Sequence, residues 1–221
     1  YLLIAVLAGL GLLLAWQLPQ SRASAAVRYD FALTRALLGR PIIRAALLTT
    51  AIGHGLMFLV MNATPLAMSL CGLSLEISAE VIRWHMLGMF LPAFVAGPLV
   101  DRLGATRMAL LGCAVLALSA AVALSGLNQW FFLFSSFLLG LGWNLMLVSG
   151  STLLAAGHSA DERGQAQGLM ELGNGLVAAC ASFASGALIT GLGWSALNIA
   201  MLPLLAIALW MLTLQSRPKP V

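Results

Sequence analysis

The sequence predicts an all-α membrane protein with seven transmembrane helices. The 221 residues are 61% hydrophobic and only 8% charged, with a mean hydropathy of +1.00. Soluble domains contain roughly 45–50% apolar residues. The apolar residues also fall in repeated blocks of about 20, the length of helix that crosses a bilayer. The lipid bilayer is therefore the first expected partner of this chain.

The apolar runs give the spans in order along the chain. We expect helices at 1–18, 44–70, 81–100, 107–125, 129–156, 165–190 and 194–214. The segment 19–43 is the only long connector between spans, and it is basic: a single acid, Asp30, accompanies Arg22, Arg28, Arg35 and Arg40.

Charge predicts the orientation of these spans. Basic loops stay on the cytoplasmic side, so the connector 19–43 and, by alternation, the C-terminal tail are expected inside. Of the eleven Lys and Arg residues, only Arg83 falls on the outer side. Membrane orientation thus explains the net charge of +4, and no nucleic-acid partner is expected. Trp84, Trp130 and Trp194 open spans at the outer surface, where tryptophan gathers.

The connector between the third and fourth spans carries a dense charged motif, "GPLVDRLGATR". A glycine near its start allows close helix approach, and a second glycine permits a tight turn. The motif resembles motif A of the major facilitator superfamily. The resemblance implies a conformational clamp on the cytoplasmic side, made by Gly97, Asp101, Arg102, Gly104 and Arg107.

The resemblance extends along the whole chain. "DERGQAQGL" is similar to the loop before the eleventh helix of the superfamily, and "MNATPLAM", "RWHMLGMFLPAF" and "LGLGWNLMLVSGSTLL" resemble a bacterial branch whose small-molecule substrates are mostly unassigned. The resemblance implies that the chain corresponds to helices six to twelve of a superfamily member. Its parts would be the last helix of an N-terminal bundle (1–18), a cytoplasmic interdomain loop (19–43), a C-terminal six-helix bundle (44–214) and a cytoplasmic tail (215–221).

The function implied by the resemblance is secondary active transport. A small organic molecule would cross the bacterial inner membrane by alternating access, with the missing N-terminal bundle of the same polypeptide as partner. The second, third, fifth and sixth spans would face the cavity, and the fourth and seventh would face lipid. The near absence of strongly polar residues from the fourth and seventh spans agrees with this assignment.

His54 is the first candidate for proton coupling. It lies ten residues beyond Arg44, about 15 Å into the membrane at the helical rise. Gly53 and Gly55 flank it, and Pro65 is expected to interrupt the helix above it, as happens at transporter sites. The alternative is a histidine that hydrogen-bonds a neighbouring carbonyl for packing alone.

Polar and polarisable side chains within the spans are the candidates for substrate contact. Methionine adapts to varied apolar ligands, and amides supply hydrogen bonds, although both also serve ordinary helix packing. Trp143 is the one tryptophan deep within a span. The predicted cavity residues are Met61, Asn62, Trp143, Asn144, Gln167 and Asn174.

Glu171 is the second and preferred coupling candidate. It is the one acid predicted inside an apolar span, and an ionised carboxylate in hydrocarbon is costly. Gln167 and Asn174 share its helix face, so the sixth span presents a polar stripe suited to a wet cavity. We expect Glu171 to bind and release a proton during transport. The alternative is a structural glutamate that hydrogen-bonds across helices.

Glu80 and Arg83, with His85 beside them, open the third span at the outer rim. The i, i+3 spacing allows an ion pair. We expect a solvated pair at the gate; a snorkelling arginine is the alternative.

Other function classes find little support. No G-x-S-x-G or H-E-x-x-H motif is present, so an intramembrane hydrolase is disfavoured and the protein is predicted not to be an enzyme. Three scattered cysteines indicate neither disulfides nor a metal site, and no cofactor is expected. A non-transporting membrane scaffold or sensor remains the main alternative.

Overall fold

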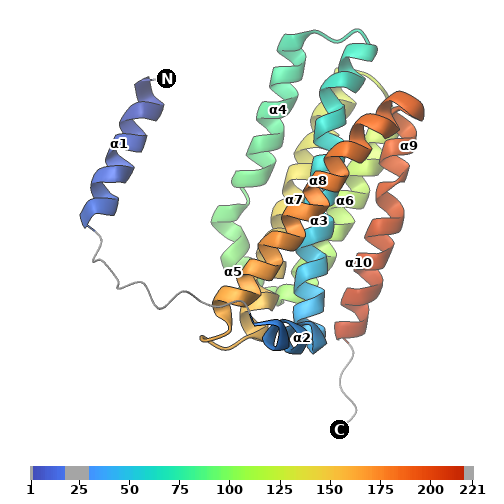
Figure 1. The fold of residues 1–221 in the computed structure, drawn as a ribbon. Coiled ribbons are helices and arrows are strands. Elements are labelled where there is room, and N and C mark those ends of the chain that lie inside the picture. Colours follow the sequence, from blue (N-terminus) through green and yellow to red (C-terminus); the bar gives the residue numbers. More distant parts are fainter. Residues whose placement is uncertain (1, 18–29, 217–221) are drawn as a thin grey trace.

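Every regular element in the described part of the chain, residues 2–17 and 30–216 of the computed structural model, is an α-helix (Figure 1). The prediction of an all-α protein is confirmed. The helices are α1 (Leu2–Gln17), α2 (Phe31–Gly39), α3 (Pro41–Leu70), α4 (Leu75–Phe90), α5 (Ala93–Leu103), α6 (Ala105–Leu124), α7 (Gln129–Gly157), α8 (Arg163–Gly191), α9 (Gly193–Ile199) and α10 (Met201–Ser216).

Six helical stretches in the described chain are long and apolar enough to cross a membrane. They match the last six predicted spans, with α4–α5 and α9–α10 each forming one interrupted span. Helix α1 corresponds to the predicted span 1–18 and stands apart from the bundle in Figure 1.

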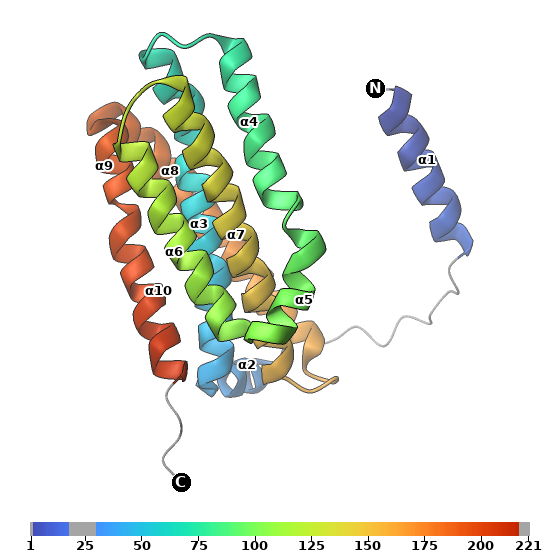
Figure 2. The ribbon, with the colours of Figure 1, turned by 180° about the vertical axis from the view of Figure 1, so that it is seen from behind.

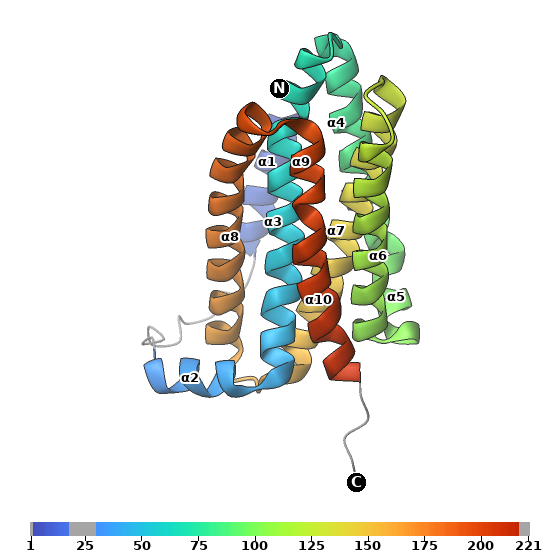
Figure 3. The same cartoon turned by 90° about the vertical axis from the view of Figure 1, so that its right-hand side faces the viewer.

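The predicted interdomain loop, 19–43, is helical in its described part. Asp30 caps α2: its side chain accepts hydrogen bonds from the backbone N–H groups of Ala32 at 2.8 Å and Leu33 at 3.2 Å. Helix α2 then lies across one end of the bundle (Figure 3), with Leu37 fully buried. The prediction of a loop up to residue 43 was wrong, because this cap starts a helix that the bundle packs against. Arg22 and Arg28 lie outside the described residues.

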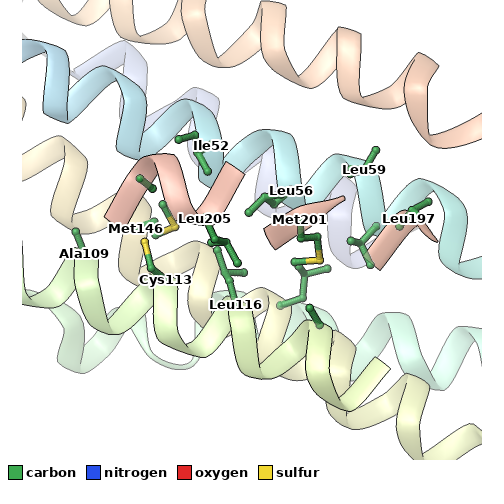
Figure 4. Packing of buried hydrophobic residues seen from close by; sticks show 14 of the residues in the cluster. Ile52, Leu56, Leu59, Ala109, Cys113, Leu116, Met146, Leu197, Met201 and Leu205 are labelled. Atoms are coloured by element: carbon green, nitrogen blue, oxygen red, sulfur yellow. The ribbon is translucent and has the colours of Figure 1, made fainter. Parts of the chain in front are cut away.

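The bundle has two central helices and two flanking ones. Helix α3 packs against α7 and α8, and α7 also packs against α4 and α6. Helix α10 packs against α6 and α3. The main apolar core lies between these helices (Figure 4), where Leu56 of α3, Leu116 of α6 and Met201 of α10 are fully buried. Helices α4 and α8 therefore form the two edges of the bundle.

Glycines allow the central helices to approach closely. A Cβ atom added at Gly140 of α7 would lie 2.5 Å from the carbonyl oxygen of His85 in α4. One added at Gly150 of α7 would lie 3.1 Å from the carbonyl oxygen of Ala46 in α3. Because these neighbours are backbone atoms, α7 is fixed against both helices by contacts that only glycine permits.

The helix interruption occurs at Pro92 rather than Pro65. Helix α3 continues through Pro65, whereas the third span starts six residues before the predicted position 81 and breaks between Phe90 and Ala93 (Figure 2). Proline removes one backbone N–H in either place. At the Pro92 break, the side chain of Asn144 donates a hydrogen bond of 2.8 Å to the carbonyl oxygen of Met89. The Asn144 side chain thus satisfies a backbone carbonyl that has no partner within the helix where α4 ends.

The two ends of the bundle differ in charge. Helix α2, the α5–α6 turn, the α7–α8 loop and the end of α10 lie at one end (Figure 1), which carries Arg35, Arg40, Arg44, Arg102, Arg107 and Arg163. The opposite end carries Arg83. Trp194 lies at that opposite end but is buried, 5.1 Å from the ring centre of Phe132. Its predicted place in the lipid headgroups was therefore wrong.

Candidate functional site

His54 and Trp143 meet at the interface of the two central helices. Their ring centres are 5.4 Å apart, with the rings nearly perpendicular. Gly53 makes this approach possible, since a Cβ added there would lie 3.3 Å from the Cβ of Met146 on α7. The sequence singled out both residues, but only the packing of α3 on α7 brings them together.

The two side chains retain unused hydrogen-bonding capacity. His54 Nδ1 lies 2.9 Å from the carbonyl oxygen of Thr50. A carbonyl only accepts, so Nδ1 carries the hydrogen and Nε2 is the nitrogen left to bind a proton. The buried Nε1 of Trp143 has no hydrogen-bond partner among the described residues. This N–H donor is therefore buried without a partner in the described chain.

Asn174 is the clearest unsatisfied polar group on α8. Its side chain is 4% exposed, yet neither its Nδ2 nor its Oδ1 has a hydrogen-bond partner in the described chain. Burying an amide without hydrogen bonds costs about 1–3 kcal/mol. The amide of Asn174 is thus buried in the bundle with neither its donor nor its acceptor satisfied by a described residue.

Gln167 and Glu171 lie on the same helix but are exposed. Glu171 forms no ion pair with any described residue. The structure also corrects the prediction that Glu171 is the one acid within a span, because Glu76 and Glu80 of α4 and Asp101 of α5 lie within the span Leu75–Leu103. Glu171 remains the acid furthest from the ends of its span, in a 29-residue helix that starts at Arg163.

The remaining predicted contacts lie in different places. Asn62 of α3 donates a hydrogen bond of 2.8 Å to Ser182 Oγ of α8, which ties the two polar helices together. Met61 is partly buried against the core. Asn144 is 5% exposed and faces α4 through its bond to Met89, away from the His54–Trp143 pair. The structure therefore separates Asn144 from Trp143, although they are adjacent in sequence.

The charged motif forms the turn between α5 and α6. Gly104 has φ +83°, as the predicted tight turn requires. Asp101, Arg102 and Arg107 are exposed, and none pairs with a described residue. Gly97 faces open space, with nothing within 4 Å of an added Cβ. Any close helix approach at Gly97 must therefore come from outside the described chain.

An ion pair at the basic end was not predicted. Both Nη atoms of Arg40 donate to the Glu162 carboxylate, each at 2.7 Å, and Nη1 also donates to the carbonyl oxygen of Gly157 at 2.9 Å. The hydrogen bonds from Arg40, followed by one from the Ser159 backbone, lower the pKa of Glu162 to about 2. Glu162 was visible in the motif "DERGQAQGL", but its partner is 122 residues away in sequence.

Gln165 completes this connection. Its side chain donates to Thr34 Oγ1 and to the carbonyl oxygen of Asp30, both at 2.5 Å. Helix α2 is thus attached to the start of α8 by one ion pair and one buried amide. No sequence signal marked Gln165, because both of its partners lie in the connector.

His85 is more deeply buried than predicted. Instead of lying at the outer rim, it is 4% exposed, and its Nδ1 lies 2.9 Å from the carbonyl oxygen of Ser136 on α7. The predicted ion pair does form between Arg83 and Glu80. In the part of the chain that the structure describes, no cluster of three or more His, Cys, Asp or Glu residues is arranged to hold a metal ion.

Comparison with known proteins adds independent evidence. Residues 50–221 match the sequence profile of the Major Facilitator Superfamily. The chain is 36% identical over 189 residues to a riboflavin transporter of Brucella anthropi, an alignment that covers 82% of this chain and 48% of the relative. It is 33% identical to an uncharacterized MFS-type transporter of Bacillus subtilis, covering 70% and 37%.

A more distant match is a methylenomycin A resistance protein of Bacillus subtilis, 27% identical over 75% of this chain and 36% of the relative. The chain therefore spans about half the length, or less, of the curated relatives it matches.

Proposed function

The chain belongs to the major facilitator superfamily of membrane transporters, and on that premise we propose that it is the C-terminal half of a secondary carrier. It is a multi-pass integral membrane protein with six helices suited to crossing the bilayer. The proposed activity is alternating-access transport of a small organic molecule across the bacterial inner membrane, with the basic end and the C-terminus in the cytoplasm.

The exposure of α8 carries this proposal. Only 22% of the most apolar 18-residue stretch of α8 is buried. Glu171 and Gln167 are among the exposed residues of this helix. A carboxylate and an amide that faced lipid in the middle of a span would be costly. A second bundle that covers α8 and encloses water removes this cost. We assign 44–214 to the C-terminal bundle, 19–43 to the interdomain connector, 1–18 to the last helix of the N-terminal bundle and 215–221 to a cytoplasmic tail.

The first proposed substrate contacts are the buried groups with unused hydrogen bonds. Trp143 supplies an indole N–H beside the His54 ring, and Asn174 supplies an amide. Met61 and Asn62 on α3, Gln167 on α8 and the free Oδ1 of Asn144 are the further candidates. A flat heteroaromatic molecule suits an indole and an imidazole, because aromatic rings stack well with one another. Riboflavin is the first substrate to test, since one relative is a riboflavin transporter.

Proton coupling is assigned first to Glu171. An exposed carboxylate on a cavity helix meets water in one state and a closed interface in the other, so the transport cycle exposes it to both sides of the membrane in turn. His54 is the second candidate, through Nε2. We propose that Asp101 and the arginines of the α5–α6 turn clamp the cytoplasmic side by pairing with the N-terminal bundle.

The test uses a protein with both bundles, reconstituted in liposomes. Glu171→Gln should abolish riboflavin transport driven by a pH gradient but retain riboflavin exchange, because only the proton step is lost. Asp161→Asn, in the α7–α8 loop, is the matched control and should transport normally. If Glu171→Gln keeps the parental gradient-driven rate and pH profile, Glu171 is structural and His54 becomes the coupling candidate. If no flavin or other small solute moves, a scaffold or sensor is favoured.

A further inference from the structure

A pocket of about 440 Å³ lies between the first turns of α4 and α7, at the end of the bundle opposite the basic loops. This volume falls within the range of about 300–1,000 Å³ usual for small-molecule sites. Half of the lining residues are aromatic, one is leucine and two are polar. They are Trp84, Trp130, Phe134, Leu133, Glu80 and Gln129.

One lining residue, Glu80, forms an ion pair with Arg83, which lies beside the pocket and outside its lining. One Glu80 oxygen accepts a hydrogen bond of 2.9 Å from Trp84 Nε1, and the other pairs with Arg83. The Arg83 side chain is 68% exposed and the Glu80 side chain 44%. Both charges can therefore reach a ligand from outside while Trp84 holds the carboxylate in place.

The pocket lies on the side of α7 turned away from the candidate transport site. Trp143 follows Trp130 by thirteen residues, which at about 100° per residue places it roughly 140° away around the helix. Trp143 contacts His54 of α3. Trp130 and Phe134 lie on the opposite side of α7, one helical turn apart. Their rings stack with centres 6.3 Å apart. Trp130 and Phe134 are more than half exposed on this side. We therefore expect this side of α7, unlike the side that carries Trp143, to face lipid near the headgroups, where tryptophan gathers.

We propose that this pocket binds a phospholipid with a primary ammonium headgroup. The headgroup is a zwitterion, and Glu80 and Arg83 present the complementary pair: carboxylate to ammonium and guanidinium to phosphate. The indole faces of Trp84 and Trp130 add attraction for the cation. The glycerol and upper acyl carbons would lie over Leu133 and Phe134.

This chemistry discriminates among phospholipids. An anionic headgroup without an amine leaves Glu80 facing negative charge. A quaternary ammonium headgroup has no N–H with which to hydrogen-bond the carboxylate, although it retains attraction to the indoles. Glu80 and Arg83 therefore have separable roles: Glu80 selects the amine, and Arg83, beside the pocket, binds the phosphate common to all three lipid classes.

The experiment measures lipid retention by native mass spectrometry on the full chain, purified with an equimolar mixture of phosphatidylethanolamine, phosphatidylcholine and phosphatidylglycerol. We expect phosphatidylethanolamine to be retained about tenfold over each of the others, the effect of one charge-assisted hydrogen bond. Glu80→Gln should bring the three lipids to equal retention. Arg83→Gln should lower the retention of all three together.

Glu76→Gln is the matched control, because Glu76 is exposed one turn earlier on α4 and outside the pocket lining. It should keep the parental preference. Equal retention of the three lipids by the parental chain overturns the proposal, as does a preference that survives Glu80→Gln. The comparison among lipids is made within each sample, so a partly unfolded Glu80→Gln variant does not imitate the predicted loss of preference. The Arg83→Gln retention is compared with that of Glu76→Gln at equal folded fraction, so that unfolding does not account for the joint fall. Transport plays no part in this readout, so it is independent of the proposed function.

Discussion

Helices α7 and α8 have the same length and similar composition but opposite surroundings. Each contains 29 residues, with a mean hydropathy of 1.8 for the most apolar window of α7 and 1.6 for that of α8. Half of the α7 window is buried, against 22% of the α8 window. Helix α7 contacts three neighbours closely, whereas α8 packs mainly on α3. Composition therefore identifies both as membrane helices but does not distinguish a helix that holds the bundle together from one that offers a surface.

Polar groups with partners lie where α7 meets α4, although Trp143 Nε1, on the α3 side of α7, has none in the described chain. On α7, the Ser136 carbonyl and the Asn144 side chain bond to His85 and Met89 of α4. On α8, the Asn174 amide is unpaired and Glu171 is exposed. The lesson is that polar groups with partners stabilise the fold, whereas those without partners are the better candidates for transport. Paired substitutions on the two helices test this distinction.

The largest expected difference concerns matched glycines. Gly140→Ala on α7 places a Cβ within 2.5 Å of the His85 carbonyl oxygen, whereas Gly173→Ala on α8 meets nothing within 4 Å. Overpacking against backbone should lower the free energy of unfolding by about 1–3 kcal/mol for Gly140→Ala. Gly173→Ala should raise it by up to about 1 kcal/mol through helix propensity. Denaturant unfolding in detergent measures both, and equal losses would contradict the distinction.

A smaller difference is expected for matched asparagines. Asn144→Ala removes the hydrogen bond at the α4–α5 break and should cost about 0.5–1.5 kcal/mol of stability. Asn174→Ala removes an amide without partners and should leave stability unchanged or raised, while substrate binding weakens. Unfolding and substrate binding are measured on the same preparations. A stability loss for Asn174→Ala equal to that for Asn144→Ala would show that Asn174 is structural.

The smallest effect concerns pH and the attachment of α2 to α8. Arg40 lowers the pKa of Glu162 from 4.5 to about 2 in the folded protein. The carboxylate is favoured in the folded state, so its contribution to stability is complete above about pH 4.5 and is lost as the pH falls towards 2. The difference in unfolding midpoint between the parent and Glu162→Gln should be constant from pH 5.5 to 8.

This stability difference should shrink below pH 4.5. A difference that changed between pH 6 and 8 would instead make the Arg40–Glu162 pair sensitive to cytoplasmic pH. Asp161→Asn, next to Glu162 but without an ion pair in the described chain, is the control and should show no such dependence.

Much of the architecture was predictable from the sequence because the bilayer restricts the choices. Backbone groups in hydrocarbon must be hydrogen-bonded within the segment, so an apolar run of sufficient length forms a helix. The six described spans, the turn at Gly104 and the basic end with Arg102 and Arg107 all follow from local composition. Candidate residues such as His54, Trp143 and Glu171 stood out because polar groups are rare in such runs.

Only the tertiary structure decided which of these residues meet. His54 and Trp143 are 89 positions apart in sequence by their numbering, and their contact depends on the close approach of α3 to α7 at Gly53. The helix break lies at Pro92, where Asn144 can satisfy the carbonyl of Met89, and not at Pro65. The period of a helix shows which residues share a face, but the rotation and depth at which two helices pack determine the partner of each face.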